Sequence, residues 1–170
     1  MNPLAPERIE GWLREMGLQP RRIEEQTAIW AYVVGYPSPP RQMLVINPKS
    51  KPRAVIIATE LTLLPQHHEA FGRFSDDAKR AFHIDLQETL NRDYVEYLVR
   101  EGPNRWQDCP AGFQTSSVIF DDALTLDSLA LRLSATFRAQ IAGFLCVERH
   151  FGRSPAGGTG TFDFTPTGRQ

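Results

Sequence analysis

The order of the hydrophobic segments constrains the fold of this chain more than any other feature of its sequence. Apolar residues recur at helical spacing first, then in three strand-like runs, at helical spacing again, in two more strand-like runs and in one long helix. These segments cover residues 6–16, 23–36, 42–46, 53–60, 75–90, 94–99, 113–120 and 125–147. Short connections between the first three strands indicate an antiparallel meander. The sequence therefore predicts an α+β fold with an antiparallel sheet of about five strands and helices packed on it, in the order α-β-β-β-α-β-β-α.

One of these boundaries leaves two alternatives open. Residues 93–99 either extend the preceding helix or form a strand, and the change in apolar period after Asn91 favours the strand. Pro65 suits the first position of a helix, so a short additional helical piece is expected after it. Ser75 and Thr125 are expected as the N-caps of the two longer helices that follow.

The run at residues 23–36 is apolar on both of its faces. A strand in a sheet with one solvated face alternates apolar and polar residues, so each face of this run needs a cover. Helices of the same chain supply one cover, and a further helix, a second subunit or a ligand supplies the other. We expect the aromatic face, with Trp30, Tyr32 and Tyr36, to contact a partner protein, the alternative being that all three belong to the core.

The last helix is apolar on nearly its whole circumference. Such a helix must be buried on more than one side, and in a small domain a second subunit provides the second cover. The sequence therefore predicts a homodimer. The residues expected at its interface are Leu131, Leu133, Ala135, Phe137 and Ile141.

Composition limits the classes of function. The chain has 170 residues, 41% of them hydrophobic, which suits one domain over residues 1–151, followed by a flexible tail rich in Gly, Pro and Thr over 152–170. A net charge of −1 argues against non-specific nucleic-acid binding. No apolar run is long enough for a membrane span and no signal-peptide pattern opens the sequence, so a cytoplasmic protein is expected.

The sequence contains no strong catalytic or metal-binding motif. His67, His68 and His83 are the only metal-like cluster, and adjacent histidines on a helix point roughly 100° apart, so they do not share an ion as an i, i+4 pair would. Cys109 and Cys146 lack zinc or redox spacing. We therefore expect no enzymatic activity, no cofactor and no metal. A small metal-dependent enzyme or metal-binding protein built on the three histidines is the competing hypothesis.

The sequence resembles type III secretion chaperone-like proteins and their YbjN-like relatives. The similar stretches are Ile9-Glu10-Gly11-Trp12-Leu13, Lys51-Pro52-Arg53-Ala54-Val55-Ile56-Ile57, Leu64-Pro65-Gln66-His67-His68 and Asp122-Ala123-Leu124-Thr125-Leu126-Asp127. The resemblance spans residues 6–150. It implies a small homodimer that binds another protein and has neither a reaction nor a cofactor. The YbjN-like type, an adaptor or regulatory module, suits the near-neutral charge better than a secretion chaperone does.

Overall fold

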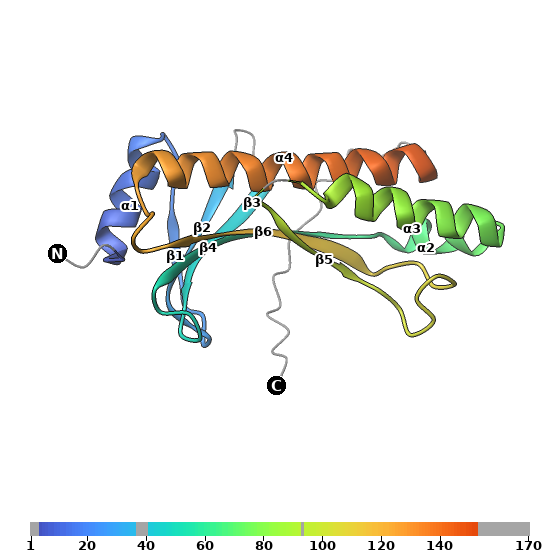
Figure 1. Cartoon of the computed structure of the whole chain (residues 1–170), viewed down its shortest axis with the longest axis horizontal. Helices are drawn as coiled ribbons and strands as arrows, with labels where there is room; N and C mark the ends of the chain where they lie inside the picture. Colours follow the sequence, from blue (N-terminus) through green and yellow to red (C-terminus); the bar gives the residue numbers. More distant parts are fainter. Residues whose placement is uncertain (1–3, 37–40, 93, 153–170) are drawn as a thin grey trace.

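The computed structural model describes residues 4–36, 41–92 and 94–152. Four helices and six strands follow one another in these ranges (Figure 1). They are α1 (Pro6–Glu15), β1 (Arg21–Ile23), β2 (Ala28–Tyr36), β3 (Arg41–Pro48), β4 (Ala54–Thr62), α2 (Pro65–Gly72), α3 (Asp76–Leu90), β5 (Glu96–Arg100), β6 (Gly112–Phe120) and α4 (Leu126–Phe151). The tail predicted for residues 152–170 lies outside the described residues except for Gly152.

The six strands form one sheet in the order β1-β2-β3-β4-β6-β5, and each neighbouring pair is antiparallel. The predicted α+β class and antiparallel sheet are therefore confirmed. The predicted strand number was too low, because the run at 23–36 is a hairpin rather than one strand. The Glu25 carboxylate accepts hydrogen bonds from the backbone N–H of Thr27 (3.1 Å) and from its hydroxyl (2.8 Å), which closes a turn between β1 and β2.

Local sequence explains where the helices begin. Pro6 opens α1 at a position where a missing N–H has no cost. The hydroxyl of Ser75 accepts a hydrogen bond from the N–H of Ala78 at the start of α3. Thr125 and Ser128 satisfy each other's backbone N–H groups at the start of α4. Both predicted N-caps are therefore confirmed. No helix within the described ranges is long and apolar enough to cross a membrane.

Residues 96–100 form a strand, as predicted from the change in apolar period after Asn91. Tyr94 has a positive φ of 65°, which turns the chain away from the direction of α3. Its carbonyl oxygen then accepts a hydrogen bond from the Ser117 hydroxyl of β6 at 2.9 Å. This contact helps to hold the following residues beside β6 as β5.

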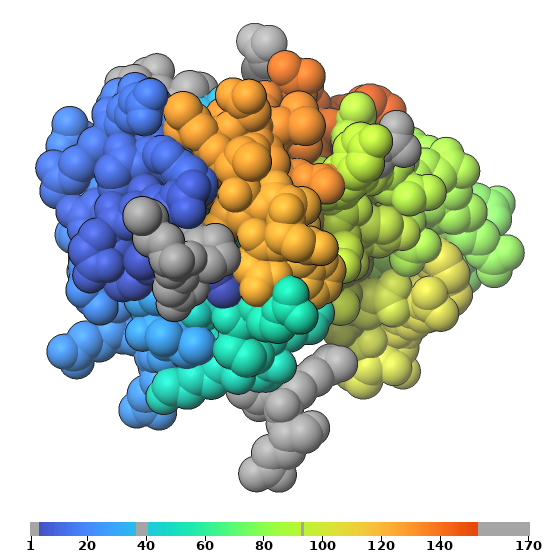
Figure 2. Space-filling model, turned by 60° about the vertical axis from the view of Figure 1, so that its left-hand side comes forward, coloured from blue at the N-terminus to red at the C-terminus, as the bar shows by residue number. Residues whose placement is uncertain are grey.

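Two hydrophobic cores lie between the sheet and the helices. Figure 1 shows α1, α3 and α4 on one side of the sheet, with α2 beside α3 at one end. The first core lies at the opposite end and joins β2, β3 and β4 to α1 and the start of α4 (Figure 1). Helix α1 and the start of α4 lie side by side there (Figure 2). The second core joins β6 and the end of α4 to α2 and α3. The 26-residue α4 spans both cores, so it holds the two ends of the molecule together.

A buried polar seam separates the two cores. The hydroxyls of Ser117 on β6 and Thr136 on α4 lie 2.8 Å apart. Thr115 donates to the carbonyl oxygen of Thr136 at 3.3 Å, and the Gln140 amide donates to the carbonyl oxygen of Glu60 at 3.3 Å. These bonds fix the axial position of α4 over the sheet, because a shift of one turn would leave buried polar atoms unpaired.

Candidate interaction surface

The face of the sheet opposite the helices carries an apolar surface, which we call the open face. Directly opposed residues on five neighbouring strands form one continuous apolar row across it. The row consists of Ile23, Ala31, Ile46, Ile56 and Val118. A second row on the same face places Val33, Leu44 and Ala58 side by side. The hydrophobic cluster on this face contains strand residues and none from a helix of the described chain.

Part of the open face remains accessible, whereas Leu44 and Ile46 of the central strand β3 are only 6% and 8% exposed. Ile23, Val33, Ile56 and Val118 are partly exposed, whereas their smaller neighbour Ala31 is fully buried. An antiparallel sheet with one solvated face usually has polar residues on that face, so a row of apolar residues there is unusual. The open face is therefore apolar surface without a cover among the described residues, and such surfaces mark interaction sites.

The open face becomes polar toward β5. Glu60 and Gln114 are directly opposed in the next row of β4 and β6. Arg100 forms an ion pair with the Glu60 carboxylate at 2.5 Å and donates to the Thr62 hydroxyl at 3.1 Å. Both ends of the sheet bend away from the helices, so that the open face is concave (Figure 1). One end of this concave surface can bury apolar groups, and the other can donate and accept hydrogen bonds.

Trp30 and Tyr32 lie in the core, which was the alternative to the partner contact that we expected. Their side chains are 4% and 1% exposed and lie in the core under α1. The Trp30 indole donates a hydrogen bond to the Leu4 carbonyl oxygen at 3.0 Å. A bulge lies between Ala28 and Trp30 in the pairing of β2 with β3. Tyr36 is partly buried and packs edge-to-face against Phe137 of α4, with ring centroids 5.5 Å apart.

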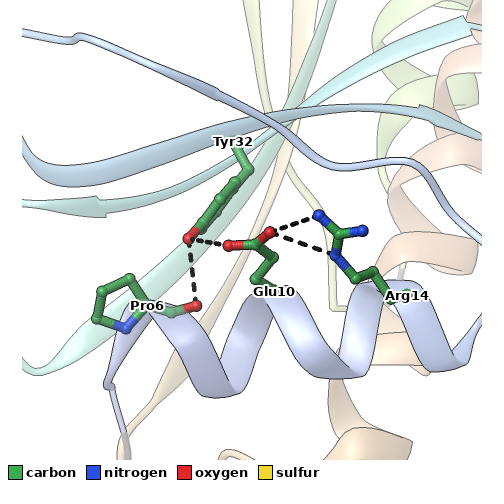
Figure 3. A network of polar contacts seen from close by, with 4 residues as sticks. All are labelled: Pro6, Glu10, Arg14 and Tyr32. Atoms are coloured by element: carbon green, nitrogen blue, oxygen red, sulfur yellow. Dashed lines mark hydrogen bonds and ion pairs between the residues drawn. The ribbon is translucent and has the colours of Figure 1, made fainter.

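The Tyr32 hydroxyl joins α1 to the sheet (Figure 3). It points from β2 at the helix, 3.3 Å from the Pro6 carbonyl oxygen and 3.2 Å from the Glu10 carboxylate, which also pairs with Arg14 at 2.7 Å. The bonds from Arg14 and Tyr32 lower the pKa of Glu10 below its ordinary value. Burial, followed by the bond to Glu10, raises the pKa of Tyr32. Glu10 is therefore ionised at neutral pH while it accepts two hydrogen bonds from Arg14 and one from Tyr32.

The lowered pKa of Glu10 predicts how stability depends on pH. Its contribution is fully present above the ordinary pKa of 4.5 and is lost as pH falls through the lower pKa of the folded protein. Urea titrations from pH 7 to pH 3 should therefore show that Glu10→Gln is less stable than the wild type at neutral pH and that the difference shrinks below about pH 4.5. A difference that grows with acid would contradict this role of Glu10.

The predicted interface residues of α4 divide between its two sides. Leu133 is fully buried in the first core, so its place in a dimer interface was predicted wrongly. Phe137 is partly exposed while its ring packs against Tyr36, so its role in dimerisation stays a prediction. Leu131 is 61% exposed on the outer side. Ala135 and Ile141 are partly exposed, so a role of these three residues in dimerisation stays a prediction.

His67 and His83 are held by different local contacts. Nδ1 of His67 accepts a hydrogen bond from the Leu64 N–H at the start of α2 (3.1 Å), and burial lowers the pKa of this histidine. His83 is fully buried, with Nε2 3.1 Å from the Asp108 carbonyl oxygen, and burial lowers its pKa as well. Nδ1 of His83 has no hydrogen-bond partner. Within the described ranges, no three His, Cys, Asp or Glu side chains lie where they could hold one metal ion.

Two hollows lie on the described surface. One of about 390 Å³ is bounded by α2 and the loop before β6, and His68 and Asp108 lie on its rim. Cys109 also borders it, and burial raises the pKa of this thiol to about 12, which keeps it protonated and unreactive. The other hollow, of about 30 Å³, lies on the open face between Val33, Leu44 and Ala58.

Sequence reasoning identified the two-sided apolar pattern only in residues 23–36. The runs Met43-Leu44-Val45-Ile46 and Ala54-Val55-Ile56-Ile57-Ala58 are also apolar at every position. Because successive residues of a strand point to opposite faces, these runs place apolar side chains on both faces of β3 and β4. This signal was sufficient to predict a second apolar face of the sheet, but not which of the two faces the helices cover.

Comparisons with known proteins place the chain in a family. Residues 5–145 match the model of a family described as "Uncharacterized conserved protein (DUF2299)", and the chain belongs to this family. A solved structure, the crystal structure of an uncharacterized protein from Methanothermobacter thermautotrophicus, is similar with a TM-score of 0.77 and 26% sequence identity. The similarity covers 86% of this chain and 98% of that chain. No curated protein matches the chain.

Proposed function

We propose that this DUF2299 protein is a non-enzymatic binding module that holds a segment of another protein against its open face. The observation that carries the proposal is that α1, α3 and α4 lie on one side of the sheet, while the apolar row across five strands on the other side lacks a cover among the described residues. Burial of apolar surface is the main favourable contribution to protein association.

The dimensions of the open face favour a polypeptide over a small molecule. Ligand pockets for small molecules usually enclose about 300–1,000 Å³, and the hollow on the open face measures only about 30 Å³. Five strands at spacings of about 4.8 Å present an apolar row about 19 Å wide, which matches a helix of about 13 residues. A concave apolar surface suits the convex side of such a helix, the mode in which amphipathic helices bind to grooves.

The polar end of the open face restricts which segments fit. Glu60, Gln114 and Arg100 lie in or beside the row that follows the apolar ones, so a bound helix meets donors and acceptors at that end. The ligand of this proposal is therefore an amphipathic helix whose apolar side chains contact β1 to β4. The finer assignment, a cytoplasmic adaptor or regulatory protein of the YbjN-like type, is supported only by the sequence resemblance described above and remains part of the proposal.

The proposal predicts which side chains contribute to binding. Helical peptides of about 13 residues, selected from a displayed library on the wild-type protein, provide the probe. Val33→Asp and Ile56→Asp should each weaken peptide binding by about thirtyfold or more, because each introduces a charge at the centre of an apolar contact. Leu145→Asp on the outer side of α4, where the leucine is 51% exposed, is the matched control and should leave the affinity unchanged. Fluorescence polarisation measures all four proteins.

Two further variants complete the experiment. Val33→Thr, which has a similar shape but adds a hydroxyl, should weaken binding less than Val33→Asp. Because Val33 is partly exposed, this change should alter the melting temperature little, so that loss of fold is distinguished from loss of contact. Equal affinities for the wild type and both aspartate variants would reject the open face as the binding surface. Tighter binding by a chain that ends at Gly152 would identify residues 153–170 as a competitor for the same surface.

A further inference from the structure

Strand β5 ends the sheet on one side and presents an unusual group of exposed apolar side chains. It pairs with β6 alone, and no strand of the described chain pairs with its other edge. Tyr94, Tyr97 and Leu98 are 70%, 38% and 51% exposed, and they lie within five consecutive positions. An edge strand has unpaired backbone N–H and C=O groups that another strand can satisfy. The edge therefore combines free hydrogen-bonding groups with apolar side chains.

The sequence of β5 determines which strand fits this edge. It reads Glu96-Tyr97-Leu98-Val99-Arg100, with an acidic residue at one end, a basic residue at the other and Leu98 at the centre. In an antiparallel pair of two such strands centred on Leu98, each Glu96 lies opposite Arg100 of the other strand. Tyr97 lies opposite Val99 in the same register. A parallel pair in register would instead oppose like charges, which is unfavourable.

We propose that β5 pairs with β5 of a second copy of this chain, in antiparallel register about a two-fold axis at Leu98. The pairing is self-complementary, as an isologous dimer interface requires. Opposite charges and an aromatic next to a β-branched residue are cross-strand pairs that stabilise antiparallel sheets. The charges at the ends of β5 disfavour an arbitrary apolar strand and favour this one.

Contacts within the chain already hold Arg100 where Glu96 of the second copy would approach it. Its Nη2 binds Glu60 and Thr62, which fixes the guanidinium on the open face beside the edge. Its Nε atom is buried and has no partner. Glu96, Leu98 and Arg100 point to the open face, since Leu98 and Glu96 are opposed to Gln114 and Ser116 of β6. Glu96 of the second copy would thus approach an arginine that is already held in position.

The dimer would join the two sheets into one. Because opposed residues on paired strands point to the same side, the open faces of both copies would lie on one side of the continuous sheet and the helices on the other. Two binding surfaces side by side would then favour a partner with two helical segments through a raised effective concentration. The β5 pairing itself rests on β5 alone and does not depend on the function proposed above.

Sedimentation velocity tests the pairing with matched lysine variants. Leu98→Lys places two like charges opposite each other on the two-fold axis and should raise the dissociation constant of the dimer by about tenfold or more. Leu145→Lys on α4 changes an equally exposed leucine, 51% in both cases, and should leave the dimer intact. Val33→Asp on the open face should also leave it intact, so that failure of dimerisation and failure of peptide binding are distinguishable. Circular dichroism confirms that each variant is folded.

Disulfide trapping tests the register directly. Leu98→Cys should yield a covalent dimer under mild oxidation, because the two thiols face each other across the axis, whereas Leu145→Cys should not. Cys146 is buried and Cys109→Ser removes the other native thiol. A wild-type chain that sediments as a 19.2 kDa monomer up to millimolar concentration would overturn the proposal. A dimer that Leu145→Lys dissociates and Leu98→Lys does not would overturn it as well.

Discussion

Trp30→Ala should destabilise the protein by about 3–5 kcal/mol, the usual cost of emptying a large aromatic site in a core. The indole is 4% exposed, packs beside Tyr32 with ring centroids 5.7 Å apart and donates its N–H to the Leu4 carbonyl oxygen. Its loss would leave a cavity under α1 and remove the hydrogen bond to the Leu4 carbonyl oxygen. Urea denaturation followed by circular dichroism measures the change in the free energy of unfolding.

Two control measurements show whether Trp30 acts through the stability of the core or through contact with a partner. Ile29→Ala changes the neighbouring residue, which is 53% exposed, and should alter the free energy of unfolding by no more than about 0.5 kcal/mol. Peptide binding by folded Trp30→Ala should equal that of the wild type, since the indole lies on the helix side of the sheet. A Trp30→Ala protein of unchanged stability that no longer binds peptide would show that the aromatic face contacts a partner after all.

Leu133→Ala should cost about 2–5 kcal/mol of folding free energy, whereas Leu131→Ala on the same helix should cost about 0.5 kcal/mol or less. The two residues are two positions apart, but Leu133 is fully buried in the first core and Leu131 is 61% exposed. Thermal and urea denaturation of both variants at one protein concentration provide the measurement.

The dependence of the melting temperature on protein concentration, measured for the same two variants, tests the alternative that the chain dimerises through α4. If α4 formed a dimer interface, Leu131→Ala would lower the melting temperature more at high protein concentration than at low concentration, because a dimer is stabilised by mass action. We expect no such dependence for Leu131→Ala. A strong dependence would assign the dimer to α4 instead of β5.

Much of the fold was predictable because its signals are local. Helix caps at Ser75 and Thr125 and the apolar stripe of α4 are properties of neighbouring residues, and all three were found. The split of residues 23–36 into β1 and β2 depends on one side chain, since Glu25 closes the turn without Gly, Pro or Asn. Standard turn signals rely on those residues, so this hairpin was missed.

The direction in which a two-sided apolar strand faces was not predictable from its sequence. Both faces of β2 are apolar, so its pattern alone does not show which of them turns to the helices, and its pairing contains a bulge at Ala28 and Trp30. The bulge arises from pairing with β3, a contact with residues far along the chain. Composition favoured the aromatic face for a partner, because aromatic residues dominate interfaces. In the structure the aromatic face instead binds α1 through Trp30 and Tyr32.

The candidate site depended on topology rather than on any one strand. The apolar row from Ile23 to Val118 joins five strands whose order places β6 next to β4, and α2, α3 and β5 separate these two strands in the sequence. The sequence predicted strands and helices but not which face of the sheet the helices cover. Once α1, α3 and α4 lie on one face, the residues of the other face follow from the register.

Methyl chemical shifts of the protein with a bound helical peptide measure the central claim most directly. If the open face is the binding surface, the methyl signals of Val33, Leu44 and Ile56 shift on titration, while those of Leu131 and Leu145 on the outer side of α4 do not. Intermolecular contacts from the peptide would then be confined to the same open-face methyl groups. Shifts that cluster on α4 and leave Val33 and Ile56 unchanged would contradict the account.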